Sequence, residues 1–259
     1  MIKMNNLQQT DQIIRGWLEE LRMDVLREMR DPLAVSEKTS RKDLVTNIDK
    51  SNEKKIVSFI RKFDPQAQIL GEEGSGDDVK DMHGHVWIID PLDGTLNFVK
   101  QRDNFAIMIA LYIDGKGVLG YIMDVTSDII YGGGPEIGVF TQSHELKAPA
   151  NLTLREGLLG VSGPMLVHDC YNLQAIDEAS SGVRILGSAG MEFIQVLTGK
   201  QNGYISHLMP WDFAAGKILS ETLELLVTKV DGTPVDMLSS NDVLVSTRNT
   251  QKDILNMIR

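Results

Sequence analysis

An apolar run that ends in two acids and a tight turn constrains this chain more than any other feature. Residues 86–89 read Val-Trp-Ile-Ile, which predicts a short buried strand. Asp90 follows directly at the end of this run. Pro91 and Gly94 then predict a turn that lets Asp93 point back toward it. Two carboxylates held together raise each other's pKa, and bound Mg²⁺ removes that cost because hard cations prefer oxygen ligands. The segment therefore predicts a metal site at the end of a strand.

The same turn supplies groups that suit a phosphate. It frees the backbone carbonyl of Leu92 as a further oxygen ligand for a cation. Gly94-Thr95 then opens a helix-like segment, and the free N–H groups at the start of a helix can bind a phosphate oxygen. A cation site and an anion site this close together indicate chemistry on a phosphate group.

Three further acidic clusters stand beside predicted helices and strands. They are Asp43-Leu44-Val45-Thr46-Asn47-Ile48-Asp49, Gly71-Glu72-Glu73 and Trp211-Asp212. Any one of these acids has an ordinary explanation as a helix N-cap or a turn residue. Four clusters on four separate loops are poorly explained in that way. Together they predict a single site that binds several metal ions.

Periodicity predicts mostly helix, then strands, in the first half of the chain. Residues 11–30 and 51–63 carry apolar side chains at helical spacing, with Thr10 as the N-cap of the first helix and Pro32 as its end. The polar stretch between these helices, residues 36–42, predicts a loop. Strands are expected at residues 69–70, 86–89, 106–113, 118–125, 129–131 and 138–141, with a turn at 132–135.

The second half alternates short strands with helices. Strands are expected at residues 158–162, 183–186, 203–205 and 243–246, and helices at 168–179, 190–198, 213–226 and 251–257. This alternation is typical of α/β structure. A polar connector at 146–154 divides the chain into residues 1–145, which carry most of the acids, and residues 146–259, which would complete the active site and its substrate pocket.

Charge and cysteine content exclude several classes of protein. The formal net charge of −10 argues against a nucleic-acid binder or an anionic-membrane binder, but it permits a phosphate substrate if bound cations supply positive charge. Cys170 is the single cysteine, so the chain can form no internal disulfide, as expected in a reducing compartment. The polar N-terminus lacks the apolar run of a secretory signal, and no run of 18 apolar residues is present. A cytoplasmic enzyme is expected.

The four acidic motifs resemble those of the inositol monophosphatase family in order and spacing. The matching segments are 43–49, 71–73, Trp-Ile-Ile-Asp-Pro-Leu-Asp-Gly-Thr-Leu-Asn-Phe at 87–98 and Trp-Asp-Phe-Ala-Ala-Gly at 211–216. The resemblance covers residues 1–255. It implies an α/β fold of alternating αβαβα layers, of the type shared with fructose-1,6-bisphosphatase. It also implies a homodimer, and a small phosphorylated metabolite as the substrate.

The resemblance further implies two or three Mg²⁺ ions per subunit and inhibition by Li⁺, which would compete at the second metal site. Glu72, Asp90 and the Leu92 carbonyl match the ligands of the first metal, and Glu72 also approaches a weaker third site. Asp90, Asp93 and Asp212 match the ligands of the second. The expected reaction is direct attack by water, without a phosphoenzyme intermediate.

Other residues match catalytic and substrate-binding positions of the family. Asp49 and Thr95 match the pair that orients and deprotonates the attacking water, and Lys38 matches the lysine of a mobile loop. Gly94-Thr95 resembles the phosphate cradle, beside Asp93 and Asp212. Gly187-Ser188-Ala189 resembles the segment that lines the substrate pocket.

One position departs from the pattern of the inositol-specific enzymes. Those enzymes carry a glutamate about seven residues before the Trp-Asp motif, whereas residues 203–210 here contain no acid. Ser206 or His207 are the candidates to replace it. Because a lost hydroxyl acceptor relaxes specificity, the expected substrate is inositol monophosphate with broadened specificity. NADP(H), fructose 1,6-bisphosphate and 3′-phosphoadenosine phosphates are the alternatives within the superfamily.

Two rival hypotheses are a phosphatase of another type and a protein of another functional class. Haloacid-dehalogenase-type phosphatases also place Asp-Gly-Thr after an apolar strand, but their spacing of Asp-x-Asp-Gly-Thr is one residue shorter than the spacing from Asp90 to Thr95. A non-catalytic regulatory or scaffold protein on this fold would be marked by a degenerate site. Here Asp49, Glu72 and the remaining acids of the motifs are all present.

Overall fold

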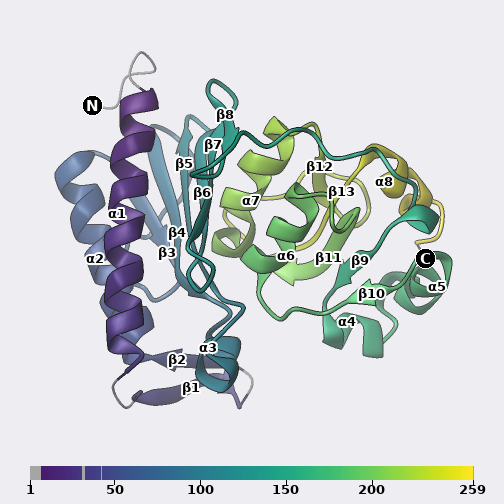
Figure 1. The fold of residues 1–259 in the computed structure, drawn as a ribbon, viewed down its shortest axis with the longest axis horizontal. Coiled ribbons are helices and arrows are strands. Elements are labelled where there is room, and N and C mark those ends of the chain that lie inside the picture. The colour runs from purple at the N-terminus through teal and green to yellow at the C-terminus, as the bar shows by residue number, and fades with distance from the viewer. Residues whose placement is uncertain (1–6, 31–32, 42, 259) are drawn as a thin grey trace.

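Alternating layers of helix and sheet make up the chain. The structure is a computed structural model that describes residues 7–30, 33–41 and 43–258. Helices α1 (Leu7–Glu28) and α2 (Asn47–Phe63) cover one face of a six-stranded sheet (Figure 1). Helices α6 (Ala189–Leu197) and α7 (Pro210–Thr222) lie between this sheet and a second, five-stranded sheet. Further helices cover the outer face of the second sheet. The predicted αβαβα arrangement is confirmed.

The six-stranded sheet has the order β3-β4-β5-β6-β7-β8. Its strands are β3 (Gln68–Gly71), β4 (His85–Asp93), β5 (Ala106–Ile113), β6 (Lys116–Asp124), β7 (Ile129–Gly134) and β8 (Gly138–Phe140). β3 and β4 are parallel, and the other neighbours are antiparallel. Both faces of the sheet are covered by helices, so β4 to β6 read as nearly continuous apolar runs. Their outer-face side chains pack against α1 and α2 in one apolar core.

The five-stranded sheet has the order β10-β9-β11-β13-β12. Its strands are β9 (Leu159–Val161), β10 (Val183–Arg184), β11 (Gly203–Leu208), β12 (Leu226–Lys229) and β13 (Asn241–Ser246). The remaining helices are α3 (Thr95–Gln101), α4 (Gly163–Val167), α5 (Leu173–Ala179) and α8 (Arg248–Leu255), with 3₁₀ turns at Leu154–Glu156 and Cys170–Asn172. The pattern of apolar residues missed α4 and β12. No helix in the described part of the chain is long and apolar enough to cross a membrane.

Two predictions in the first helical region are wrong. The first helix begins at Leu7, so Thr10 is a buried residue inside α1 and does not cap it. The stretch predicted as a loop instead forms strand β1 (Val35–Ser40), which pairs antiparallel with β2 (Asp43–Thr46). This polar hairpin lacks the apolar alternation that identifies a strand in sequence. Pro32, the predicted end of the first helix, lies outside the described residues.

The glycines at 132–134 belong to a strand and not to the predicted turn. They form the end of β7, where neighbouring groups leave no room for side chains. A Cβ on Gly132 would lie 2.4 Å from the ring of Tyr121, and one on Gly133 would lie 1.9 Å from the carbonyl oxygen of Gly138. Glycine is therefore required here because the backbone and the Tyr121 ring pack closely against the strand, and the prediction of a turn at 132–135 is wrong for these three residues.

Candidate active site

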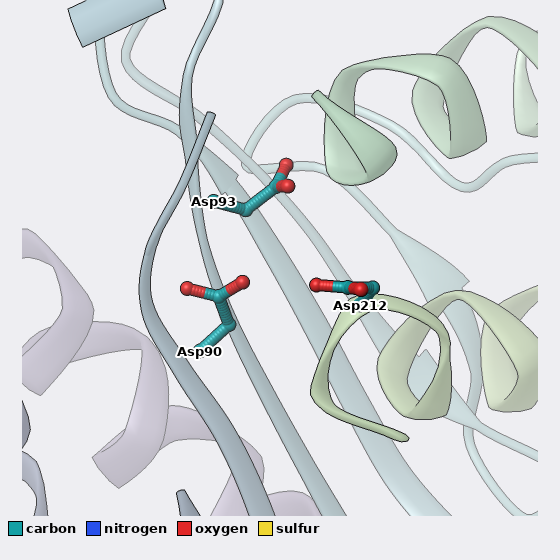
Figure 2. A group of neighbouring side chains, drawn as sticks. All are labelled: Asp90, Asp93 and Asp212. Carbon is teal, nitrogen blue, oxygen red and sulfur yellow. The ribbon is translucent and has the colours of Figure 1, made fainter. Parts of the chain in front are cut away.

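Three carboxylates from two distant parts of the chain meet between the layers. Asp90 and Asp93 come from the end of β4, where a register shift against β5 separates them. Asp212 comes from the first turn of α7. Figure 2 shows the three side chains pointing into a common space, and one oxygen from each lies within 4.8 Å of the others. The turn predicted after residue 89 is thus an irregularity within a longer strand, and it brings the two acids of β4 together.

The electrostatics of this cluster fit a bound cation. Burial raises the pKa of Asp90 well above its usual range, and the charges of Glu72, Asp93 and Asp212 raise it further. Burial and the Asp93 charge likewise raise the pKa of Asp212. Asp90 and Asp93 are buried and Asp212 is half-buried, and a group of such acids with little neutralising charge is costly to ionise. Because Mg²⁺ binds through carboxylate oxygens and would remove this cost, the donor set suits that ion.

Asp93 is held by the start of helix α6. Its Oδ2 accepts hydrogen bonds from the Ser188 hydroxyl and from the Gly190 N–H at 2.7 Å, and its Oδ1 accepts one from the Ala189 N–H at 3.0 Å. These donors oppose the effect of burial, which nevertheless raises the pKa of Asp93. The segment Gly187-Ser188-Ala189, which was expected to line the substrate pocket, therefore also supplies hydrogen-bond donors to Asp93. Gly94 permits this contact, since a Cβ there would lie 2.9 Å from the Ser188 Cβ.

Asp49 and Thr95 form a hydrogen-bonded pair beside the cluster. The Thr95 Oγ1 lies 2.8 Å from the Asp49 Oδ1 and 3.1 Å from the Leu92 carbonyl oxygen. Asp49 is completely buried, and its Oδ2 accepts hydrogen bonds from the backbone N–H and the hydroxyl of Thr46. This capping box at the start of α2 fixes the carboxylate in place. The predicted pair is therefore within hydrogen-bonding reach.

Glu72 is paired with the lysine of the β1 hairpin. The Lys38 Nζ lies 2.7 Å from the Glu72 Oε1 and also contacts Glu73. Burial raises the pKa of Glu72 to about 7, although the Lys38 charge opposes this. Glu72 stands outside the group formed by the three aspartates, yet its charge acts on Asp90. Lys38 thus occupies a strand, and it supplies the positive charge nearest to Glu72.

Glu53 shapes the loop that carries Glu72, a role that sequence reasoning missed. This completely buried carboxylate of α2 accepts hydrogen bonds from the N–H groups of Glu73 and Ser75, each at 2.6 Å. A Cβ on Gly71 would lie 2.7 Å from the Glu53 Oε2, so the glycine lets the loop pass close to it. The signal available in the sequence was an acid on the apolar side of a helix.

A cavity of about 280 Å³ opens beside Asp93 and Asp212. Ser206 of β11 lines it, whereas His207 points to the opposite face of the sheet, where its Nδ1 lies 2.8 Å from the Asp242 Oδ1. Successive side chains of a strand point to opposite faces, so only one of two neighbours can reach the cavity. Of the two proposed replacements for the missing acid, Ser206 faces the cavity and His207 is excluded.

A second missed residue, Glu192, is a buried acid in the wall of this cavity. Only 1% of its surface is exposed, and burial raises its pKa to about 7. Its Oε1 accepts the Leu186 N–H at 2.8 Å. Its Oε2 faces the Gln201 side chain, where a Cβ on Gly160 would lie 2.4 Å from both the Glu192 Oε2 and the Gln201 Oε1. The sequence signal was a single acid within the apolar run of α6.

Glu192 gives a testable pH dependence of stability. Because its pKa rises from 4.5 to about 7, the folded protein holds this proton more tightly than the unfolded chain between those pH values. The free energy of unfolding of the wild type therefore falls as the pH rises through this window. Glu192→Gln has no carboxyl proton to lose at this position. We therefore expect the Tm of the variant minus the Tm of the wild type, both measured in EDTA, to increase as the pH rises. A Tm difference that stays constant with pH would contradict this assignment.

Comparison with known proteins gives a consistent result. Residues 6–259 match the model of the inositol monophosphatase family. The chain is 34% identical over 256 residues to the inositol-1-monophosphatase of Bacillus subtilis, and the match covers 97% of each chain. A solved structure of an IMPase/NADP phosphatase complexed with Mg²⁺ and phosphate superposes with a TM-score of 0.90 at 29% identity, covering 97% of this chain and 95% of that one. A LiCl-soaked inhibitory complex of a staphylococcal inositol monophosphatase-1 superposes with a TM-score of 0.91 at 29% identity, covering 99% and 96%.

Proposed function

This chain belongs to the inositol monophosphatase family and is a hydrolase of phosphoric monoesters, and we propose that it converts inositol monophosphate to inositol and phosphate in a Mg²⁺-dependent reaction. The observation that carries the proposal is the meeting of Asp90, Asp93 and Asp212 next to the Asp49–Thr95 pair. Membership of this family argues against a haloacid-dehalogenase-type phosphatase, because phosphatases of that type use a different spacing of acids.

The residues fit two metal positions that share Asp90. Glu72, Asp90 and the Leu92 carbonyl would hold one ion, with Glu72 also near a third position. Asp90, Asp93 and Asp212 would hold the other. Bound Mg²⁺ would neutralise charge on the phosphate and lower the pKa of the attacking water. The solved Mg²⁺ and phosphate complex of the similar IMPase/NADP phosphatase supports this assignment.

Side chains and backbone groups of the protein accept the proton of the attacking water and bind the phosphate. Thr95 Oγ1 orients the attacking water, and Asp49 takes up its proton through this hydroxyl because the two are hydrogen-bonded. The N–H groups at Gly94-Thr95 hold a phosphate oxygen at the start of α3. Asp49 is buried, and the hydrogen bond from the Thr46 N–H holds its carboxylate next to Thr95. The alcohol part of the substrate occupies the cavity lined by Ser188 and Ser206.

We propose two further properties with the same function. Li⁺ inhibits the enzyme by competing at the Asp90–Asp93–Asp212 position, which is supported by the inhibitory LiCl complex of the staphylococcal enzyme. The active form is a homodimer, a proposal that rests on the family resemblance.

The substrate range is expected to be broad, because residues 203–210 lack an acid that would bind inositol hydroxyls. Phosphate release from inositol 1-phosphate and NADP⁺ should give kcat/KM values within about tenfold of each other. Ser206→Glu places a carboxylate in the cavity and should shift the ratio toward inositol 1-phosphate by about tenfold or more. His207→Glu is the matched control, since its side chain points away from the cavity. A preference that responds equally to both variants would overturn this view of the pocket.

A further inference from the structure

We propose that Glu192 and Asn97 are positioning residues that set the hydrogen bonds on Asp93 and leave one oxygen of that carboxylate free for a cation. Both bind the backbone of Leu186, which precedes the segment 188–190 that donates hydrogen bonds to Asp93. The inference rests on the proposed function, because it takes Asp93 as a metal ligand. Neither residue belongs to the three-carboxylate cluster itself.

The hydrogen bonds on Asp93 are distributed unequally between its two oxygens. Oδ2 accepts from the Ser188 hydroxyl and the Gly190 N–H, whereas Oδ1 accepts from the Ala189 N–H alone. Each carboxylate oxygen offers about two acceptor positions. Oδ2 is therefore saturated, and Oδ1 retains one position. The start of α6 thus makes Asp93 a ligand through a single defined oxygen.

The Ser188 hydroxyl and the N–H groups of Ala189 and Gly190 can keep their positions around Asp93 only if the backbone just before α6 is held in place. Leu186 is held in this way, because both of its backbone groups are bound. Its N–H donates to the Glu192 Oε1 at 2.8 Å, and its carbonyl oxygen accepts from the Asn97 Nδ2 at 2.7 Å. Glu192 lies on α6 in the second half of the chain, and Asn97 lies on α3 in the first half. The entry into α6 is therefore tied to both halves.

The surroundings of Leu186 leave little freedom for the segment to shift. Gly187 has a φ of +76°, and a Cβ there would lie 3.3 Å from the Asn97 Oδ1. The Asn97 Nδ2 also donates to the carbonyl oxygen of Asn104 at 2.9 Å, which holds the amide in place. Glu192 and Asn97 are 1% and 6% exposed. Residues that support a metal ligand in this way typically change metal affinity by about 10–100-fold when they are replaced.

The test is Mn²⁺ binding to the full-length, metal-stripped protein, followed by the electron paramagnetic resonance signal of free Mn²⁺. Glu192→Met removes the acceptor for Leu186 and should weaken binding of one ion by about tenfold or more. Glu192→Gln keeps an acceptor oxygen at the same place and should bind within about threefold of the wild type. Gln195→Met, a partly exposed position on the same helix, is the matched control and should change nothing.

A second variant decides the matter if Glu192→Met does not fold. Asn97→Asp preserves size but cannot donate to the Leu186 carbonyl, so it should also weaken one ion by about tenfold. Wild-type affinity in a folded Glu192→Met or Asn97→Asp protein would overturn the inference, as would equal weakening in Glu192→Gln and Glu192→Met. A wild-type protein that binds no Mn²⁺ would instead overturn the proposed function, so the two failures are distinguishable.

Discussion

Replacing Asp90 by asparagine is expected to remove phosphatase activity while making the metal-free protein more stable. Asp90 is shared by both proposed metal positions, and several kcal/mol of transition-state stabilisation depend on such ions. We therefore expect kcat to fall by about 10³-fold or more. The opposite effect on stability follows from burial and from the charges of Glu72, Asp93 and Asp212, which raise the pKa of Asp90. A neutral amide relieves that repulsion, while its oxygen still accepts the Leu92 N–H that now lies 2.9 Å from Asp90 Oδ1.

Two measurements separate these effects. Thermal unfolding in EDTA at pH 7 should show the variant more stable by on the order of 1–3 kcal/mol. Added Mg²⁺ should then raise the Tm of the wild type much more than that of the variant, because a ligand stabilises only the protein that binds it. Asp78→Asn, at a side chain that is 83% exposed, controls for the change in net charge. A variant with wild-type kcat, or one that is less stable in EDTA, would contradict the assignment of Asp90.

Asp49→Asn is expected to have the second largest effect, and it should act on kcat rather than KM. The carboxylate contacts Thr95 and is completely buried, so it has no access to the substrate alcohol. Removing the group that takes the proton should lower kcat by about 10²–10⁴-fold. The substitution also weakens the capping box with Thr46 and should cost about 1 kcal/mol of stability.

Variants of Thr95 provide the comparison for Asp49. Thr95→Ser keeps the hydroxyl and should retain most of the activity, whereas Thr95→Val should lose nearly as much as Asp49→Asn. Steady-state kinetics with saturating Mg²⁺ measure these losses, and the double variant should be little worse than either single one, because the two residues act as a unit. Near-wild-type kcat in Asp49→Asn, or additive losses in the double variant, would rule out the proton path through Thr95.

The parts of the site that lie close together in sequence were predictable from it. Asp90 and Asp93 were predicted directly after an apolar run, and they lie at the end of β4. The motifs of Asp49 and Asp212 were predicted beside the starts of two helices, and these acids lie in the first turns of α2 and α7. Local chemistry is sufficient there, because turn residues and strand ends limit where a short segment can point. The alternation of helical and strand patterns indicated α/β structure, whereas the αβαβα layer order was predicted from the resemblance to the family.

The parts that depend on strand register or distant contacts were not predictable. Choosing between Ser206 and His207 requires knowing which face of β11 meets the cavity, because a shift of one residue exchanges the two faces. The role of Glu192 depends on Leu186 and Asn97, and no spacing in the sequence indicates that they meet. Strand β1 was missed because a polar hairpin is stabilised by backbone pairing and does not show an apolar pattern.

The most direct test of the account is phosphate release from inositol 1-phosphate by the wild-type protein after complete removal of divalent ions. In EDTA the folded protein should release no phosphate above the uncatalysed rate. Titration with Mg²⁺ should restore release to a saturating rate, and Li⁺ added at fixed Mg²⁺ should lower it. Release that is equally fast in EDTA, or a folded protein that releases no phosphate at any Mg²⁺ concentration, would contradict the claim that these carboxylates form a metal-dependent phosphatase site.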